Sequence, residues 1–270
     1  MKMDSYKGKL SVIALITDFG TADPYVGIVK GVIAGINPLA QCIDLTHEVP
    51  PQDVTTAAFL LASCYTDFPK GTLFLGVVDP GVGSDRKAIA LKTQDYTFVG
   101  PDNGIFGLVI RKEKRDIVCH EILKLGRHAR NISNTFHARD IFAPAAARLS
   151  LGYDIETLGP VLSGPCPCKI PRPVVKDNEI IAEVIHIDHF GNLITNLDKS
   201  TFPLYHTSDN NVTIQLLGNI VPFVKSYTDV PIGSPLALWG SSDFLEIAVN
   251  SGSAERLFNA KKGTSIHLFF

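Results

Sequence analysis

Long apolar runs, an excess of one charge and an even set of cysteines are all missing from this sequence of 270 residues. Segment 1–9 is polar and precedes only a short apolar run, so we expect neither a secretory signal peptide nor a membrane span. The formal net charge of −2 provides no basic surface for nucleic acid or for a membrane. The five cysteines lie mostly in apolar surroundings, which predicts reduced thiols in a cytoplasmic protein.

Several common catalytic motifs are absent as well. No G-x-G-x-x-G follows the first expected strand, and there is no phosphate-binding loop and no G-x-S-x-G elbow. The Asp-Phe-Gly triplet at 18–20 matches a kinase motif, but the other kinase motifs are missing. His47 has no second histidine at the zincin spacing, and the C-P-C pair at 166–168 has no second pair to complete a zinc site. We therefore expect no metal and no cofactor.

The first half of the chain alternates strand-like and helix-like segments. Strands are expected at 10–16, 40–45 and 71–78, a hairpin at 88–91 and 96–99, and helices at 25–36, 53–65, 105–110 and 140–149. Asp53 is a plausible N-cap for the second helix. This rhythm predicts an α/β domain at 1–165, with a mostly parallel sheet that has helices on its faces.

The second half has a different pattern. Prolines concentrate around 165–173, which predicts an extended linker at 166–175. Short strands separated by turns follow, at 179–188, 193–197, 211–217, 220–224, 236–239, 245–249 and 264–269. This spacing predicts a second domain at 176–270, a small all-β barrel or sandwich.

Polar residues gather where expected strands end. In parallel α/β sheets, ligands bind beyond the carboxyl ends of the strands. Three clusters follow strands or open a helix, and one lies in a turn of the β domain: 17–20 with Asp23, 79–83 with Arg86, 137–140, and 188–192.

Each cluster also has a plain structural interpretation, because an Asp before Gly is often only a turn former and an Asp–Arg pair is often only a surface ion pair. Metal binding by Asp18, His47, Asp79 and His137 is a further alternative. The first three clusters should nevertheless converge on one side of one sheet, which favours a functional site.

Five motifs occur in this order along the chain: Thr17-Asp18-Phe19-Gly20 with Asp23, Asp79-Pro80-Gly81-Val82-Gly83 with Arg86, Pro101-Asp102-Asn103-Gly104, Phe136-His137-Ala138-Arg139-Asp140-Ile141-Phe142-Ala143-Pro144, and Asp188-His189-Phe190-Gly191-Asn192 with Thr195-Asn196. Together they resemble the S-adenosyl-L-methionine hydroxide adenosyltransferase family, whose halide-using relatives are fluorinases and chlorinases. The resemblance covers about 12–258. It implies an N-terminal α/β domain, a C-terminal β-barrel, and hydrolysis of S-adenosyl-L-methionine to adenosine and L-methionine. It also implies a homotrimer, with substrate held between the N domain of one subunit and the C domain of its neighbour.

The resemblance implies a water-activating triad of Asp79, Arg86 and His137. Halide users have Tyr at the positions of Asp79 and His137, and a halide-binding Ser at the position of Ala138. All three differences point to water as the nucleophile. Ala138 stands where many hydrolases have Gly, and either residue leaves room beside His137.

The other implied site residues would hold the substrate. Asp18 would accept both ribose hydroxyls, since a carboxylate is acceptor-only with two oxygens, and the amide of Asn192 would read the adenine edge. The remaining implied contacts are Asp23 and Asp188 with the methionine ammonium, Ser241 or Ser242 with the amino-acid end, and Phe190 and Tyr227 with the adenine ring. Three alternatives stay open: a non-catalytic nucleoside-binding protein, a halide-dependent adenosyl transferase, and a metal-dependent hydrolase of another nucleotide.

Overall fold

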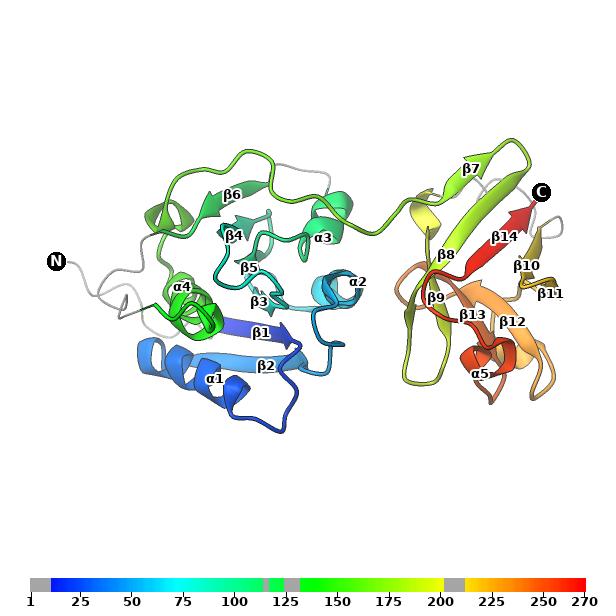
Figure 1. Cartoon of the computed structure of the whole chain (residues 1–270), viewed down its shortest axis with the longest axis horizontal. Helices are drawn as coiled ribbons and strands as arrows, with labels where there is room; N and C mark the ends of the chain where they lie inside the picture. The colour runs from blue at the N-terminus through cyan, green and yellow to red at the C-terminus, as the bar shows by residue number, and fades with distance from the viewer. Residues whose placement is uncertain (1–10, 114–116, 124–131, 202–211) are drawn as a thin grey trace. The chain divides into compact units, whose positions relative to one another are not determined.

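A computed structural model describes residues 11–113, 117–123, 132–201 and 212–270 (Figure 1). The chain divides into two compact units, Met1–Lys169 and Ile170–Phe270, which are described separately below. Leu10 and Asn211, the first residues of two expected strands, and the polar segment 1–9 lie outside the described residues. Within the described residues, no helix is both long enough and apolar enough to span a membrane.

The N-terminal unit contains a six-stranded sheet with the strand order β2-β1-β3-β5-β4-β6. The strands are β1 (Ser11–Thr17), β2 (Ala40–Thr46), β3 (Leu73–Val77), β4 (Ala88–Lys92), β5 (Thr97–Pro101) and β6 (Val118–Glu121). β2, β1, β3 and β5 pair in parallel, whereas β4 is antiparallel to both β5 and β6. The expected parallel sheet and the β4–β5 hairpin are confirmed. β6 was not predicted, because its sequence Val-Cys-His-Glu offers no apolar run.

Helices cover both faces of this sheet (Figure 1). α1 (Tyr25–Ile36) packs beside α4 (Ala143–Ser150) against one face, where Ile13 and Leu15 of β1 point. α2 (Val54–Cys64) and α3 (Gly107–Lys112) pack together on the other face. Residues 13–16 are fully buried, as expected for a strand covered on both sides, which explains the continuous apolar run of β1.

Helix boundaries follow local capping chemistry. α1 spans the predicted residues, and the Asp53 side chain caps α2 by accepting from the Thr56 backbone N–H at 2.9 Å. The helix expected at 140–149 instead begins as one π-helical turn at Ala138–Phe142 that leads into α4. Pro144 has no N–H to donate to the fourth residue before it, and the Ala143 N–H bonds to the Ala138 carbonyl, five residues back.

The C-terminal unit is an eight-stranded antiparallel sheet, ordered β11-β10-β14-β8-β9-β13-β12, with β7 also paired to β8. The elements are β7 (Val174–Lys176), β8 (Glu179–Ile187), β9 (Leu193–Asp198), β10 (Thr213–Leu216), β11 (Asn219–Val221), β12 (Pro235–Trp239), β13 (Phe244–Val249), α5 (Ala254–Phe258) and β14 (Ser265–Phe269). β7 begins inside the stretch expected as a linker, and α5 is a short helix in a region expected to be all-β.

The sheet closes nearly into a barrel. The Ala237 N–H donates to the Pro222 carbonyl at 2.8 Å, and the Val224 N–H donates to the Ala237 carbonyl at 2.9 Å. The residues that follow β11 therefore bond to β12, at the opposite end of the strand order. The predicted β-barrel is confirmed, and its interior is filled by alternate strand residues such as Ile180, Ala182 and Val184 of β8.

Candidate active site

Asp79, Arg86 and His137 meet in the N-terminal unit. The Arg86 guanidinium donates from Nε to Asp79 Oδ1 at 2.9 Å and from Nη2 to Asp79 Oδ2 at 2.5 Å. Its Nη2 also lies 2.6 Å from His137 Nδ1. The Asp79 and Arg86 side chains are only 7% and 10% exposed, so solvent screens this ion pair weakly. Arg86 thus joins a carboxylate and an imidazole that are 58 residues apart in the sequence.

The contact with Arg86 fixes the protonation state of the histidine. A guanidinium only donates hydrogen bonds, so His137 Nδ1 must accept and the ring proton sits on Nε2. Burial, followed by the positive charge of Arg86, lowers the pKa of His137 below its ordinary value. His137 is therefore a neutral imidazole near pH 7 with an N–H donor at Nε2.

The loop from Asp79 to Arg86 can take its shape only with glycine at position 83. Gly83 has φ of +78°, and a Cβ there would lie 2.5 Å from the backbone carbonyl oxygen of Asn134. The loop therefore packs directly on the segment that leads to His137. The Arg86 guanidinium also stacks on an aromatic ring, since its central carbon lies 5.2 Å from the centre of the Phe142 ring.

The Pro-Asp-Asn-Gly motif supports the end of β3. Asn103 Nδ2 donates to the carbonyl of Val78 at 2.8 Å, and Asn103 Oδ1 accepts from the Ile105 N–H. Val78 immediately precedes Asp79, so this bond fixes the backbone at the start of the loop from Asp79 to Arg86. Asp102 binds the Cys166 N–H through Oδ1 at 2.6 Å, which ties the C-P-C segment to this turn.

Asp18 follows β1, which is the neighbour of β3 in the sheet. The last residue of β1, Thr17, pairs with the last residue of β3, Val77. Asp18 Oδ2 accepts from the backbone N–H of Gln52 at 2.8 Å. Gln52 has φ of +66°, a conformation rare for a residue with a side chain, and it turns the N–H toward the carboxylate. One carboxylate oxygen is thus fixed by the protein.

Three rings that sequence reasoning missed pack beside these groups. Phe19, Tyr25 and Phe136 have ring centres 5.4–6.2 Å apart in tilted and edge-on arrangements. Phe19 follows Asp18 and Phe136 precedes His137, so the cluster holds the two polar segments together. Phe19 and Phe136 belong to two of the motifs quoted above, so this signal was available in the sequence. Asp23, on the loop before α1, is exposed to solvent.

His47 belongs to another network. Its Nδ1 lies 2.8 Å from Thr17 Oγ1, and its Nε2 lies 3.0 Å from Asp44 Oδ1. Among the described residues, no three or more His, Cys, Asp or Glu side chains gather in a way that could hold a metal ion. The geometry therefore gives no support to the metal-binding interpretation of Asp18, His47, Asp79 and His137.

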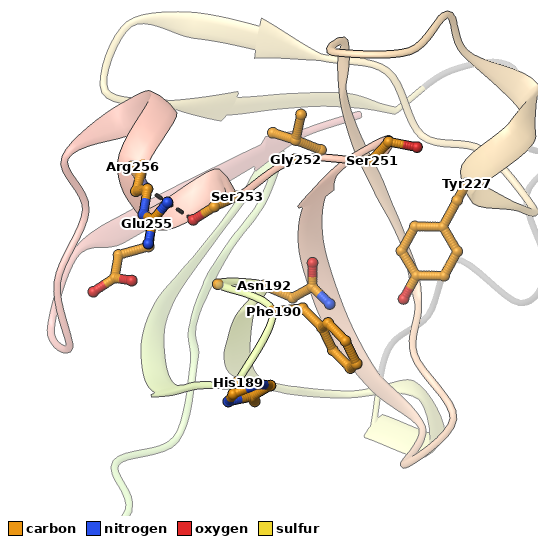
Figure 2. Close-up of a pocket in the computed structure, with 11 residues that line it drawn as sticks. His189, Phe190, Asn192, Tyr227, Ser251, Gly252, Ser253, Glu255 and Arg256 are labelled. Atoms are coloured by element: carbon orange, nitrogen blue, oxygen red, sulfur yellow. Dashed lines mark hydrogen bonds between the residues drawn. The ribbon is translucent and has the colours of Figure 1, made fainter.

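In the C-terminal unit, Phe190, Asn192 and Tyr227 line one open pocket of about 690 Å³ (Figure 2). Phe190 is 73% exposed, which leaves its ring available to a ligand. The wall that sequence reasoning missed comes from the segment between β13 and α5 and from α5 itself: Ser251, Gly252, Ser253, Glu255 and Arg256. Figure 2 shows Tyr227 on the opposite side of the pocket from Glu255 and Arg256.

Asp188 forms the turn that presents two of these pocket residues. Its Oδ1 accepts from the backbone N–H groups of Phe190 and Asn192, and its Oδ2 accepts from Asn192 Nδ2, each at 2.9 Å. Gly191 completes the turn with φ of +83°, where a Cβ would lie 2.1 Å from Ser253 Oγ. This motif therefore forms the Asx turn that its structural interpretation predicts.

Ser241 and Ser242 lie in the tight turn between β12 and β13. Within the described residues, neither is among those that line the pocket. Tyr227 donates its hydroxyl to Glu246 Oε1 at 2.6 Å. The hydroxyl proton is already used, so the ring face and the acceptor capacity of the phenol oxygen remain for a ligand.

Comparison with known proteins agrees with this two-unit architecture. Residues 13–159 match the S-adenosyl-L-methionine hydroxide adenosyltransferase N-terminal domain, and residues 182–267 match the C-terminal domain of the same family. A relative named (R)-S-adenosyl-L-methionine hydrolase, from Thermus thermophilus, is 37% identical over 95% of this chain and 98% of its own length. A protein of the same name from Methanocaldococcus jannaschii is 35% identical over 97% of both chains.

More distant relatives and solved structures extend the comparison. A fluorinase from Nocardia brasiliensis is 25% identical over 98% of this chain and 99% of its own. The crystal structure of an uncharacterized conserved protein from Thermotoga maritima superposes with a TM-score of 0.87 at 40% identity, covering 96% of this chain and 100% of that one. With both domains matched in order, this chain belongs to the S-adenosyl-L-methionine hydroxide adenosyltransferase family.

Proposed function

We propose that this protein hydrolyses S-adenosyl-L-methionine to adenosine and L-methionine through attack of water on the ribose C5′. The observation that carries the proposal is the buried hydrogen-bonded set of Asp79, Arg86 and His137 at the carboxyl edge of the sheet. The names of the relatives, which are 33–37% identical over nearly the whole chain, support the same reaction.

The chemistry requires help mainly on the nucleophile. The substrate is a sulfonium cation, so attack at C5′ expels a neutral thioether and needs no general acid for the leaving group. Water is a poor nucleophile, with a pKa of about 15.7 in bulk. Holding water and C5′ in line can supply about 7–11 kcal/mol of the barrier, so most of the site should position rather than react.

We assign the proton to Asp79. While the bond to Arg86 lasts, His137 Nδ1 is occupied and Nε2 carries a proton, so the imidazole can only donate to the water oxygen. Each Asp79 oxygen accepts one bond from Arg86 and keeps a lone pair. The attacking water becomes strongly acidic as the C–O bond forms, so a carboxylate is a sufficient base at that stage. Arg86 holds Asp79 and His137 in this arrangement through its three contacts with them.

Substrate recognition is divided between the two units. Asp18 would receive the ribose hydroxyls, since Oδ1 and the second lone pair of Oδ2 remain beside its bond to Gln52. Phe190 and Tyr227 would hold the adenine ring, and Asn192 its polar edge. The contacts proposed for the amino-acid end are Asp23, Asp188, Ser241 and Ser242.

The assembly and the compartment complete the proposal. We expect a homotrimer in which the N-terminal unit of one subunit and the C-terminal unit of its neighbour bind one substrate. All five cysteines are free thiols, which is consistent with a reducing cytoplasm. Light scattering coupled to size exclusion measures the oligomeric state directly, and a monomer that retains full activity would contradict the shared site.

A chromatographic assay for adenosine tests the reaction. The relatives' name specifies the (R) sulfonium epimer, so both epimers are supplied separately, with and without chloride and with and without a chelator. We expect adenosine and methionine in equal amounts, independent of chloride and chelator, and no turnover by Asp79→Ala or His137→Ala. Binding without product would support a nucleoside-binding protein, and a chlorinated nucleoside would support a halide-dependent transferase. A chelator-sensitive rate would support a metal-dependent hydrolase.

A further inference from the structure

Glu246 is a buried acid that the proposed reaction does not use. It lies on β13, its residue exposure is 8%, and it does not line the pocket described above. Burying a carboxyl group is unfavourable unless its oxygens find partners. Both of its oxygens lie against elements of the proposed substrate site.

One oxygen holds Tyr227. Glu246 Oε1 accepts from the Tyr227 hydroxyl at 2.6 Å. Tyr227 begins a single 3-10 turn in the connection between β11 and β12, which is capped at its start by Ser226 and Asp229. This connection lies mostly at the surface, and Tyr227 itself is 42% exposed. The bond to Glu246 therefore anchors the ring to the wall of the barrel.

The other oxygen lies against the turn that carries Ser241 and Ser242. A Cβ on Gly240 would lie 2.7 Å from Glu246 Oε2, so this oxygen lies directly against the turn. The turn closes through Gly240, whose N–H donates to the Phe244 carbonyl at 2.9 Å and whose carbonyl accepts from the Asp243 N–H at 3.0 Å. One side chain thus touches both a pocket wall and a second proposed contact segment.

We propose that Glu246 is a positioning residue that fixes Tyr227 and the 240–243 turn in the geometry that binds the nucleoside and the amino-acid end of the substrate. The proposal deepens the function given above and rests on it for the identity of the ligand. Glu246 acts through Tyr227 and Gly240 and does not touch the reacting atoms.

The chemistry of the pair favours this role over simple packing. An apolar residue of similar size would fill the same space without the cost of desolvating an acid. Burial raises the pKa of Glu246, and burial together with the bond to Glu246 raises the pKa of Tyr227. The Tyr227–Glu246 pair instead provides a short directional hydrogen bond, which specifies one orientation of the Tyr227 ring.

The test compares Tyr227→Phe, Glu246→Leu and Glu246→Gln. Hydrogen exchange of 222–234 and 240–243 is measured without ligand, followed by the adenosine Kd by calorimetry and by KM and kcat. Loss of the bond should raise the adenosine Kd and KM by about tenfold with a smaller change in kcat, and should speed exchange in the affected segments. Glu246→Gln keeps an acceptor for the phenol and should restore most of the affinity lost in the leucine variant.

The matched control is the same chemical pair in the N-terminal unit. Tyr65 donates its hydroxyl to Glu113 Oε1 at 3.0 Å within an aromatic cluster, and Tyr65→Phe should lower Tm while leaving Kd and KM unchanged. If Glu246→Leu and Tyr227→Phe alter only Tm, like this control, the positioning role is wrong. If exchange and adenosine affinity change as expected but the wild type releases no adenosine from S-adenosyl-L-methionine, the positioning role stands and the proposed reaction fails.

Discussion

Replacing Arg86 by lysine separates the charge of this residue from its geometry. The guanidinium makes two contacts with Asp79 and one with His137 at 2.5–2.9 Å, and a longer one with the Lys87 carbonyl at 3.4 Å. A lysine ammonium keeps the charge, but it is a single point donor and cannot reproduce a fork between a carboxylate and an imidazole. Hydrogen bonds to charged groups contribute about 1.5–3 kcal/mol each, so the loss of two removes about 3–6 kcal/mol. We therefore expect kcat/KM to fall by about 100- to 20,000-fold.

The assay is adenosine release at saturating and limiting substrate, with Tm recorded to show that the variant is folded. Arg139 offers a matched control, because it makes the same forked contact with Asp140, at 2.7 and 2.9 Å, but is 39% exposed. Arg139→Lys should reduce kcat/KM by less than about fivefold. If Arg86→Lys retains activity within the same range as the control, charge alone is sufficient and the bridging role of Arg86 is refuted.

Four further predictions concern the same unit. Burial, followed by the charge of Arg86, lowers the pKa of His137 below 6.5, so kcat/KM should decline only at pH values below 6.5. In Arg86→Leu, the acidic decline of kcat/KM should begin at a higher pH than in the wild type. The unfolded chain binds this proton more readily than the folded one, so His137 reduces stability as the pH falls through its lowered pKa, and urea titrations of His137→Gln should show less acid sensitivity. Gly83→Ala should cost about 1–3 kcal/mol of unfolding free energy, and Gly164→Ala, at a similar φ of +74° with nothing within 4 Å of the added Cβ, should cost less in the same denaturant titration. Asn103→Ala removes the bond that fixes the end of β3, and should lower kcat more than it changes KM; equal effects on both would indicate a binding role instead.

The fold could be predicted from sequence wherever one periodicity persisted for long enough. The run in β1 and the helical pattern of α1 are strong signals, and both elements lie where they were expected. β6 and α5 are only four and five residues long, so neither completes a recognisable period. The π-helical turn before α4 was missed because it depends on how Pro144 ends the preceding hydrogen bonds.

The convergence of the polar segments in the N-terminal unit could be predicted, but the contacts between their side chains could not. The rule that ligands bind at the carboxyl ends of parallel strands predicted that the segments carrying Asp79 and His137 would converge. The shared contact through Arg86 follows from side-chain geometry, which no spacing in the sequence encodes. Glu246 gave no signal, since a lone acid in a predicted strand looks like an outward-facing residue, and only the three-dimensional register reveals it as buried.

Asp79 and Asp188 show why sequence alone could not separate an aspartate that organises its own turn from one that joins distant segments. Both precede glycine-containing turns, and both have carboxylates that accept several hydrogen bonds. The partners of Asp188 are within four residues of it, so its bonds stabilise the turn itself. The partner of Asp79 is a guanidinium that is also bonded to His137, 58 residues away, and local turn formation has no need of such an arrangement. Each Asp79 oxygen keeps a lone pair that can accept from a water molecule, and the His137 Nε2–H can donate to the same water. A water bonded to both groups would therefore have its proton and its lone pairs oriented together. If Asp79→Asn, which keeps the size and one acceptor, turned over substrate at the wild-type rate, this distinction between the two aspartates would not hold.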